Sequence, residues 1–390
     1  KTTFNELTQT TTQQNKRNAK MKKLFEKMMV QDNSQPSANN NNSSSPVESK
    51  PITIPKENEI YPQKRISASS INLIIIEATK SYAPEWVKLF KGIKIHGKPV
   101  NVEVTEWSLV NLASYSSYGA NRETACFLDI RVPQENRVKT VRADFLLVRS
   151  QTRGVGIKQD YRNLLFGLKF AGVPSVNSLS SIYNFLERPW VMGELMEIAR
   201  KLGHENFPVI DQNYYPNHQE MIIGPQFPAV VKVGAAHAGY GKMIINDHHT
   251  FADFASVMAL SQDYVTAEPF LQGEYDLRIQ KIGNHYRVFK RMSVSGTWKT
   301  NTGTSMMEEI ELTDKYKLWA DEASKMFGGL DILAVDAIHT TDGKEYILEV
   351  NDTSIGLCTG NEKNDLEHIR DLVVDKMQQY FYNEETSSKD

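Results

Sequence analysis

Residues 227–242 read FPAVVKVGAAHAGYGK, an apolar stretch followed by a loop of small residues that lies between Lys232 and Lys242. Glycines such as Gly239 and Gly241 let a backbone approach a polyanion and offer N–H donors without side-chain obstruction. Lysine adds a compact cation for phosphate oxygens. The spacing is not that of a P-loop, whose lysine precedes Ser or Thr. Taken alone, the stretch is equally typical of a surface turn.

Acidic residues interrupt two apolar strands further along the chain, AVDAI at 334–338 and YILEVN at 346–351. Because residues two apart in a strand share a side, Asp336, Glu349 and Asn351 are predicted to lie on one face. Three such oxygen ligands suit Mg²⁺ or Ca²⁺, with nucleotide phosphates and water completing the shell. The alternative is a pair of half-exposed strands whose charges face solvent. The short TDG turn that joins them favours the shared face.

Three further features suit a polyphosphate ligand. Arg278 lies inside the strand-like stretch YDLRIQKI, where a buried arginine needs an anionic partner and a surface arginine is the alternative. The stretch TAEPFL contains Glu268 and Phe270, and the proline between them leaves backbone groups that suit an adenine edge. Lys299 lies beside Trp298 in a polar loop.

Residues 1–69 differ from the rest and are predicted to be a disordered N-terminal tail. The stretch 33–50 is rich in Asn, Ser and Pro, so it buries too little apolar surface to offset chain entropy. Before it, 16–30 places apolar residues at helical spacing and lysines on the other faces. Such a basic amphipathic segment can lie on an anionic membrane. A transient helix in a disordered tail is the alternative.

The folded part begins near Ile71 with strands that alternate with helices, which favours a doubly wound parallel sheet. The predicted strands are 71–78, 100–107 and 143–150, and the predicted helices are 84–91 and 160–171. The second half is mixed and its strands are mostly antiparallel candidates. Helices are predicted at 179–187, 190–203, 250–261, 313–327 and 364–381, and strands at 227–234, 264–270, 276–281, 285–294, 333–338 and 345–350.

Composition places the chain among soluble globular proteins, with 390 residues of which 40% are hydrophobic and 24% charged. The net charge of −2 gives no overall attraction to nucleic acid, which is not expected as a partner. The two cysteines, Cys126 and Cys358, make no disulfide framework, so we expect a cytoplasmic location. No apolar run approaches the roughly 20 residues that span a bilayer.

The order of the chemical features is more informative than any one of them. Along the chain the order is a strand with a lysine, a glycine loop, a second lysine, an acidic hinge, a strand with an arginine and two strands with acidic residues. This order resembles the ATP-grasp superfamily, in which two α+β subdomains hold ATP and follow a Rossmann-like domain. The resemblance implies a Rossmann-like pre-ATP-grasp domain at 70–172, a two-subdomain ATP-grasp fold at 173–383 and a frayed tail at 384–390.

Longer motifs resemble the central region of synapsins, as a divergent or invertebrate-like member. They include KGIKIHGKPVNVEV, DYRNLLFGLKFAGVPSVNSLSSIYNFLERPWV, FPVIDQNYYPNHQEM, SVSGTWKTNTG and FGGLDILAV. The resemblance implies an ATP-binding phosphoprotein, peripheral on the cytosolic face of synaptic vesicles, that regulates vesicle clustering and neurotransmitter release. It also implies dimers or tetramers, a role for Mg²⁺ or Ca²⁺, and contacts with vesicle phospholipid and with actin.

Position by position, the resemblance assigns the nucleotide to Arg188, Lys232, Gly239, Gly241, Lys242, Glu268, Phe270, Arg278 and Lys299. It assigns the metal to Asp336 and Glu349, and the strand pattern adds Asn351. Three positions depart from the family: Asp336 stands where glutamate is usual, Asn351 begins an unusually polar NDT run, and Arg188 replaces a lysine. The run that ends at Ser67 resembles a basophilic kinase target, whose phosphorylation adds charge to a flexible segment.

Three functions are consistent with these features. The leading one is a regulatory ATP- and metal-binding protein that clusters vesicles, because a ligand that binds one conformation better shifts the population toward it. The alternative is an active ATP-grasp carboxylate-amine ligase, since phosphoryl transfer needs the positioning and charge stabilisation that the same residues supply. A third function makes the tail at 1–69 a membrane anchor and the folded part its scaffold. No catalytic residue is assigned.

Overall fold

The computed structural model describes residues 64–65, 69–116, 124–156, 158–235, 239–293, 305–357 and 360–382, all within the compact unit Glu57–Asp390. Several predictions lie outside the described residues: the helix at 16–30, the linker at 33–50, the kinase target Ser67, the phosphate contact Lys299 and the tail at 384–390.

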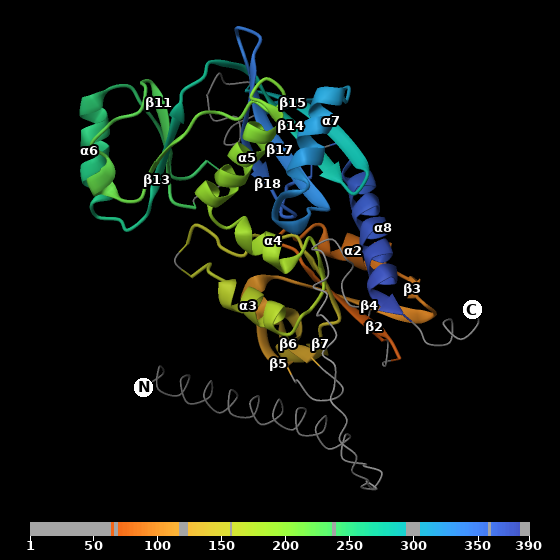
Figure 1. The fold of residues 1–390 in the computed structure, drawn as a ribbon. Helices are drawn as coiled ribbons and strands as arrows, with labels where there is room; N and C mark the ends of the chain where they lie inside the picture. The colour runs from red at the N-terminus through yellow and green to blue at the C-terminus, as the bar shows by residue number, and fades with distance from the viewer. Residues whose placement is uncertain are drawn as a thin grey trace, which may run out of the picture. The chain divides into compact units, whose positions relative to one another are not determined.

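A mostly parallel sheet forms the first part of the fold (Figure 1), in the order β3-β4-β2-β8-β9. The strands from β4 to β9 run parallel, and the short β3 pairs antiparallel at one edge. The bounds are β2 (Ile71–Ile76), β3 (Lys94–Ile95), β4 (Lys98–Thr105), β8 (Phe145–Val148) and β9 (Ser175–Val176). The predicted parallel strands are thereby confirmed.

The two faces of this sheet are covered by different elements. On one face, α2 (Ala83–Leu89) and α8 (Glu362–Tyr380) pack against Leu73, Ile75 and Leu147. On the other, α3 (Arg162–Phe170), α4 (Leu179–Asn184) and a second sheet pack against Ile74 and Leu146. Burial on both sides explains why β2 reads as a nearly continuous apolar run. The helices predicted at 84–91, 160–171, 179–187 and 364–381 correspond to α2, α3, α4 and α8.

The second sheet, β5-β6-β7, is antiparallel and was not predicted from the sequence. Its strands are β5 (Val110–Ser116), β6 (Thr124–Val132) and β7 (Arg137–Arg142). The central strand β6 is mostly buried, but its neighbours keep polar side chains along their length. Neither edge strand therefore has the apolar run or the strict alternation that marks a strand in the sequence.

A small lobe, defined as β10 to β13 with α6, follows the long helix α5 (Arg188–Leu202). Its four-stranded antiparallel sheet has the order β10-β13-β11-β12. The bounds are β10 (Asn213–Tyr215), β11 (Ala229–Val233), β12 (Lys242–Ile245), α6 (His248–Met258) and β13 (Val265–Pro269). Helix α6 covers one face through Phe251 and Met258 (Figure 1). The opposite face carries Val230, Lys232 and Glu268, so it is free to face a ligand.

A large antiparallel sheet, β16-β15-β14-β17-β18, completes the fold. The bounds are β14 (Gly273–Ile282), β15 (His285–Ser293), β16 (Ser305–Ile310), α7 (Asp314–Ala323), β17 (Ile332–Thr340) and β18 (Glu345–Asn351). Helices α5 and α7 pack on one face against Leu277, Val335 and Ile347. On the other face, Ile282, Ile332 and Ala334 share a core with α8 and the parallel sheet. The rest of that face carries the polar residues described below.

Most strands and helices predicted in the second half are present, whereas β10, β12 and β16 were not predicted. A last two-stranded pairing joins β1 (Lys64–Arg65) to β19 (Phe381–Tyr382) in parallel. Among the described residues, no helix is long and apolar enough to cross a membrane.

Candidate nucleotide and metal site

One row of side chains crosses three neighbouring strands of the large sheet. In the strand register, Arg278 of β14 lies opposite Asp336 of β17, and Asp336 lies opposite Glu349 of β18. Cross-strand partners project from the same face, so the three charged groups lie together. The register shifts just after Asp336, where Ala337 pairs with Ile347 and Leu348 is the extra residue of a bulge.

Asp336 is held by two partners from the neighbouring strands. Arg278 Nη1 donates to both carboxylate oxygens, at 3.1 and 3.2 Å, and Asn351 Nδ2 donates to Oδ2 at 2.8 Å. Burial raises the pKa of Asp336, and the charge of Glu349 adds to this while Arg278 opposes it. The predicted shared face of Asp336, Glu349 and Asn351 is present, and Arg278 has the anionic partner that its burial requires.

Glu349 is surrounded by cations. Arg188 Nη1 donates to its Oε2 at 2.6 Å, and Lys242 Nζ lies 4.0 Å from the same oxygen. Burial alone would raise the pKa of Glu349, but Arg188, Lys242 and Lys232 outweigh it, so the pKa lies below its usual value. Arg188 is the first residue of α5, where the helix dipole disfavours a cation. The carboxylate of Glu349 offsets that cost.

The most deeply buried ion pair of the site joins β11 to β13. Lys232 Nζ lies 2.6 Å and 2.7 Å from the two oxygens of Glu268, and each side chain is only 7% exposed. Gln212 Nε2 donates to Glu268 at 3.1 Å. The Glu268 side chain therefore faces Lys232 at the edge of the cleft, and its predicted place in an adenine hinge stays a prediction.

The hinge backbone differs in one respect from the prediction. The Phe270 N–H donates to the carbonyl of Pro228 at 2.9 Å, so an adenine edge would not take this donor. Proline at 269 still belongs to β13, opposite Ala229. The groups available to a purine thus begin after Phe270, toward Leu271 and Gln272, which line the cleft.

The two lysines of the opening motif face each other across a hairpin. Strands β11 and β12 pair antiparallel, and Lys232 lies opposite Lys242 in their register. Residues 236–238 lie outside the described part of the connection. Gly239 and Gly241, on its described side, have φ values of 83° and 61°, which side-chain-bearing residues rarely adopt. Burial lowers the pKa of Lys242, while Glu349 opposes that shift.

These groups line one open cleft between the small lobe and the large sheet, with a volume of about 820 Å³. Ligand pockets usually span about 300–1,000 Å³, so a nucleotide is within range. Tyr275 and the residues that follow Pro269 are among those that line the cleft. The lining side chains with charges are Lys232, Lys242, Glu268, Glu274, Asp276, Arg291, Asp336 and Glu349.

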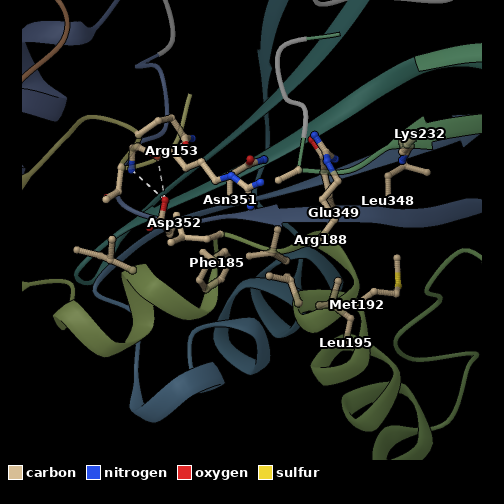
Figure 2. Close-up of a pocket in the computed structure, with 18 of the residues that line it drawn as sticks. Arg153, Phe185, Arg188, Met192, Leu195, Lys232, Leu348, Glu349, Asn351 and Asp352 are labelled. Carbon is tan, nitrogen blue, oxygen red and sulfur yellow. Dashed lines mark hydrogen bonds and ion pairs between the residues drawn. The ribbon is translucent and has the colours of Figure 1, made fainter. Parts of the chain in front are cut away.

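A second, smaller cavity of about 90 Å³ adjoins the cleft, and Lys232 and Glu349 line both. Figure 2 shows Phe185, Met192 and Leu195 on its helical side. Its opposite side holds the loop after β8, with Ser150 to Arg153, and the residues after β18. Thr152 is 2% exposed, and its hydroxyl has no hydrogen-bond partner among the described residues.

The donor set fits a magnesium-type ion. Two carboxylates, Asp336 and Glu349, and the amide of Asn351 offer oxygen ligands, and Mg²⁺ in nucleotide sites typically uses one or two carboxylates with phosphate oxygens and water. Among the described residues, no cluster of three or more His, Cys, Asp or Glu is arranged to hold a metal. A Mg²⁺ ion that also binds nucleotide phosphates and water needs only such a partial set of ligands from the protein.

Residues that line the cleft or the small cavity but were not predicted from the sequence are Thr152, Arg153, Gln212 and Arg291. The fold brings them there from distant parts of the chain; Gln212 and its partner Glu268, for example, are 56 positions apart. Lys299, assigned to a phosphate, lies outside the described residues, and the ligand roles of the other assigned residues stay predictions.

Comparison of the sequence with models of protein families identifies the family to which the chain belongs. Residues 67–175 match the model described as "Synapsin pre-ATP-grasp domain", and residues 177–379 match "Synapsin, ATP binding domain". The chain belongs to the synapsin family. It is 36% identical over 300 residues to the synapsin of Drosophila melanogaster. The matched stretch covers 75% of this chain and 29% of that protein. This synapsin-family chain therefore spans less than a third of its relative's length.

Solved structures agree with the predicted fold class, which is confirmed as a Rossmann-like pre-ATP-grasp domain followed by an ATP-grasp fold. The ATP-grasp ligase PsnB, complexed with a phosphomimetic precursor variant, Mg and ADP, has a TM-score of 0.54 at 14% identity, covering 79% of this chain and 99% of that one. D-alanyl-alanine synthetase A from Vibrio cholerae has a TM-score of 0.53 at 11% identity, with coverage of 80% and 99%.

Proposed function

We propose that this synapsin-family chain binds ATP together with one divalent metal ion, Mg²⁺ or Ca²⁺, in the cleft between the small lobe and the large sheet. The ion neutralises phosphate charge when it is bound. The side chains of Lys232, Lys242 and Arg188 would hold the phosphates, and Asp336 and Glu349 would hold the ion. The purine would lie at the hinge after Phe270.

The pairing of charges within the cleft carries this proposal. Each metal-facing acid has a cation as partner: Arg278 for Asp336, and Arg188 with Lys242 for Glu349. A polyanion and a dication can replace these internal partners without leaving any charge uncompensated, because phosphate takes the cations and metal takes the acids. Burying a charge without an opposite charge beside it costs free energy, and this exchange of partners avoids that cost.

Calorimetric titration tests the proposal directly. ATP should bind the intact protein with Mg²⁺ or Ca²⁺, and Glu349→Gln should weaken binding while keeping the size of the side chain. The loss should be on the order of 10–100-fold, as for the removal of one charge-assisted contact. Absence of binding by the parent protein with either metal would overturn it.

The biological role that we propose follows from family membership. The chain acts as an ATP-regulated component at the cytosolic face of synaptic vesicles, clusters vesicles, contacts phospholipid and actin, and forms dimers or tetramers. Phosphorylation at Ser67 would add negative charge to the chain. Sedimentation with and without ATP, and vesicle co-sedimentation of parent and Glu349→Gln proteins, test whether the nucleotide controls these properties.

The small cavity supports a second candidate function, that of a carboxylate-amine ligase. A small substrate in this cavity would lie against Lys232 and Glu349, which also line the nucleotide cleft. The hydroxyl of buried Thr152, which has no partner in the described part of the chain, would gain one there, and leaving such a group unpaired costs about 1–3 kcal/mol.

ADP release with panels of small carboxylic acids and amines tests the ligase. Turnover that depends on the added acid and is lost in Glu349→Gln favours it. Release that does not change with any acid, and does not exceed that of Glu349→Gln, counts against it. The regulatory function is unaffected by that outcome, since it needs binding without turnover.

A further inference from the structure

A carboxylate outside the cleft connects separate parts of the fold. Glu187 precedes α5 at its N-cap position, but its side chain makes no capping hydrogen bond. Arg153 Nη1 donates to its Oε1 at 2.5 Å, and the Tyr264 hydroxyl donates to its Oε2 at 2.9 Å. The partners lie 34 and 77 positions away, so this carboxylate joins tertiary neighbours instead of stabilising its own helix.

Tyr264 belongs to the small lobe and also fixes the base of the glycine loop. Its carbonyl accepts the N–H of Gly234 at 2.9 Å, at the point where β11 ends. Gly234 has a φ of 51°, so the chain turns there toward β12. Burial raises the pKa of Tyr264, and the charge of Glu187 raises it further, so the hydroxyl stays a donor throughout the physiological range. One residue thus holds both the loop and the carboxylate.

Arg153 belongs to the pre-ATP-grasp domain, in a loop with its own internal bonds. Arg153 pairs with Asp160 in an isolated bridge, and Gly154 N–H donates to the carbonyl of Gln159 at 2.7 Å. The Tyr161 N–H donates to the Thr152 carbonyl at 2.9 Å. These hydrogen bonds join the two ends of the loop and hold the backbone of Arg153 in place.

Glu187 is also adjacent to the candidate nucleotide site through the chain itself. The next residue, Arg188, forms the 2.6 Å contact to Glu349. Arg153 and Arg188 both line the small cavity and are labelled with it in Figure 2. A displacement of Glu187 would therefore move Arg188 relative to Glu349 and release Tyr264 at the base of the glycine loop.

We propose that Glu187 is a positioning residue that couples the small lobe to the pre-ATP-grasp domain. Its carboxylate holds Tyr264 from one side and Arg153 from the other, so the placement of β11 and β12 over the cleft depends on the loop after β8. The functional consequence rests on the proposed binding of ATP. The mechanical consequence is independent of ATP and is measurable in the unliganded protein.

Amide hydrogen exchange of Tyr264→Phe tests the small-lobe side. Loss of a hydrogen bond to a charged group should raise exchange at Gly234 and in β12 on the order of tenfold, while the parallel sheet keeps the rates of the parent. Tyr214→Phe is the matched control, because the Tyr214 ring packs against Tyr264 at 5.9 Å and its residue is 53% exposed. Equal exchange in the two variants overturns the proposal.

Arg153→Gln tests the coupling from the other side. It should also raise exchange at Gly234 and in β12, although Arg153 touches neither. A combined Glu187→Ala/Tyr264→Phe variant should show no more exchange than Glu187→Ala alone, because both changes remove the same bond. If Arg153→Gln changes only the rates of its own loop, Glu187 is a local anchor and the coupling is wrong.

ATP dissociation gives the functional readout. It should accelerate on the order of tenfold in Tyr264→Phe and in Arg153→Gln, and not in Tyr214→Phe. If the parent protein does not bind ATP, the proposed function fails, and the exchange comparison still decides whether Glu187 couples the two parts. If ATP binds and dissociates equally from all variants, ATP binding stands and the coupling to nucleotide is refuted.

Discussion

The buried pair of Lys232 and Glu268 allows a test that separates stability from nucleotide binding. Each side chain is 7% exposed, and the N–O distances are 2.6 and 2.7 Å. In Lys232→Met, Glu268 keeps the hydrogen bond from Gln212 but loses the ion pair with Lys232. Breaking a buried pair from one side costs about 3–5 kcal/mol. For a domain of this size, such a loss lowers Tm by about 6–20 °C.

The double change Lys232→Met/Glu268→Leu removes both charges and conserves side-chain size. Replacing a buried pair by apolar residues of similar volume is often neutral or stabilising. Gln212 then loses one acceptor, which costs about 1 kcal/mol. We therefore expect the double variant to recover to within about 1–2 kcal/mol of the parent protein.

The assay compares urea unfolding and ATP titration for four proteins: the parent, the two single variants and the double variant. The double-mutant cycle gives the coupling between the two residues. ATP binding should be lost in both variants that lack Lys232, including the double variant that folds well. A Lys232→Met protein that loses less than about 1 kcal/mol would refute the energetic reasoning. A double variant that binds ATP like the parent would refute the phosphate role of Lys232.

Three further predictions concern neighbouring groups. Arg188→Lys should keep the charge but lose the rigid fork, and should weaken calorimetric ATP affinity about 3–10-fold, less than Arg188→Met does. Arg149→Met should cost about 2–4 kcal/mol in urea unfolding, because Arg149 donates to two buried carbonyls after β18, one of them at 2.6 Å. The pKa of Asp336 is raised above its ordinary value of 3.8, and only the ionised carboxylate binds metal. The affinity of the protein for the metal–ATP complex should therefore fall as the pH falls toward that pKa. Titrations between pH 7.5 and 5.5 check this, and Asp336→Asn should show only the pH dependence of ATP itself.

Alternation along single strands made part of the site predictable. Asp336 and Glu349 are polar interruptions in apolar strands, and a period of two fixes which side they face. The turn between Lys232 and Lys242 was predictable for a similar reason, because glycines mark a turn, although the strand β12 that follows it was not predicted. Both inferences concern residues close in sequence, where local geometry determines the outcome.

Pairing between distant strands was not predictable in the same way. Nothing local to Arg278 indicates that its partner is Asp336, since that contact depends on the register of β14 against β17. Glu268 was assigned to the hinge together with the backbone after it, but the sequence did not show that it lies opposite Val230 and that its side chain pairs with Lys232. Register is set by the whole buried face, so a single sequence does not show it.

Glu187 illustrates a second limit. In the sequence it is an acidic residue before a helix, a position where a carboxylate commonly interacts with the helix dipole. In the fold its two oxygens are taken by Arg153 and Tyr264, which come from other parts of the chain. The three-stranded sheet β5-β6-β7 was missed because its edge strands lack an apolar pattern, although the central strand is buried.

A crystal structure with a non-hydrolysable ATP analogue and Mg²⁺ tests the central claim most directly. Carboxylate oxygens of Asp336 and Glu349 should lie about 2.0–2.1 Å from the ion. Lys232, Lys242 and Arg188 should contact phosphate oxygens, and the purine should lie beyond Phe270. A nucleotide bound elsewhere, or an ion in the cleft that neither carboxylate touches, would show that this cleft is not the ATP and metal site.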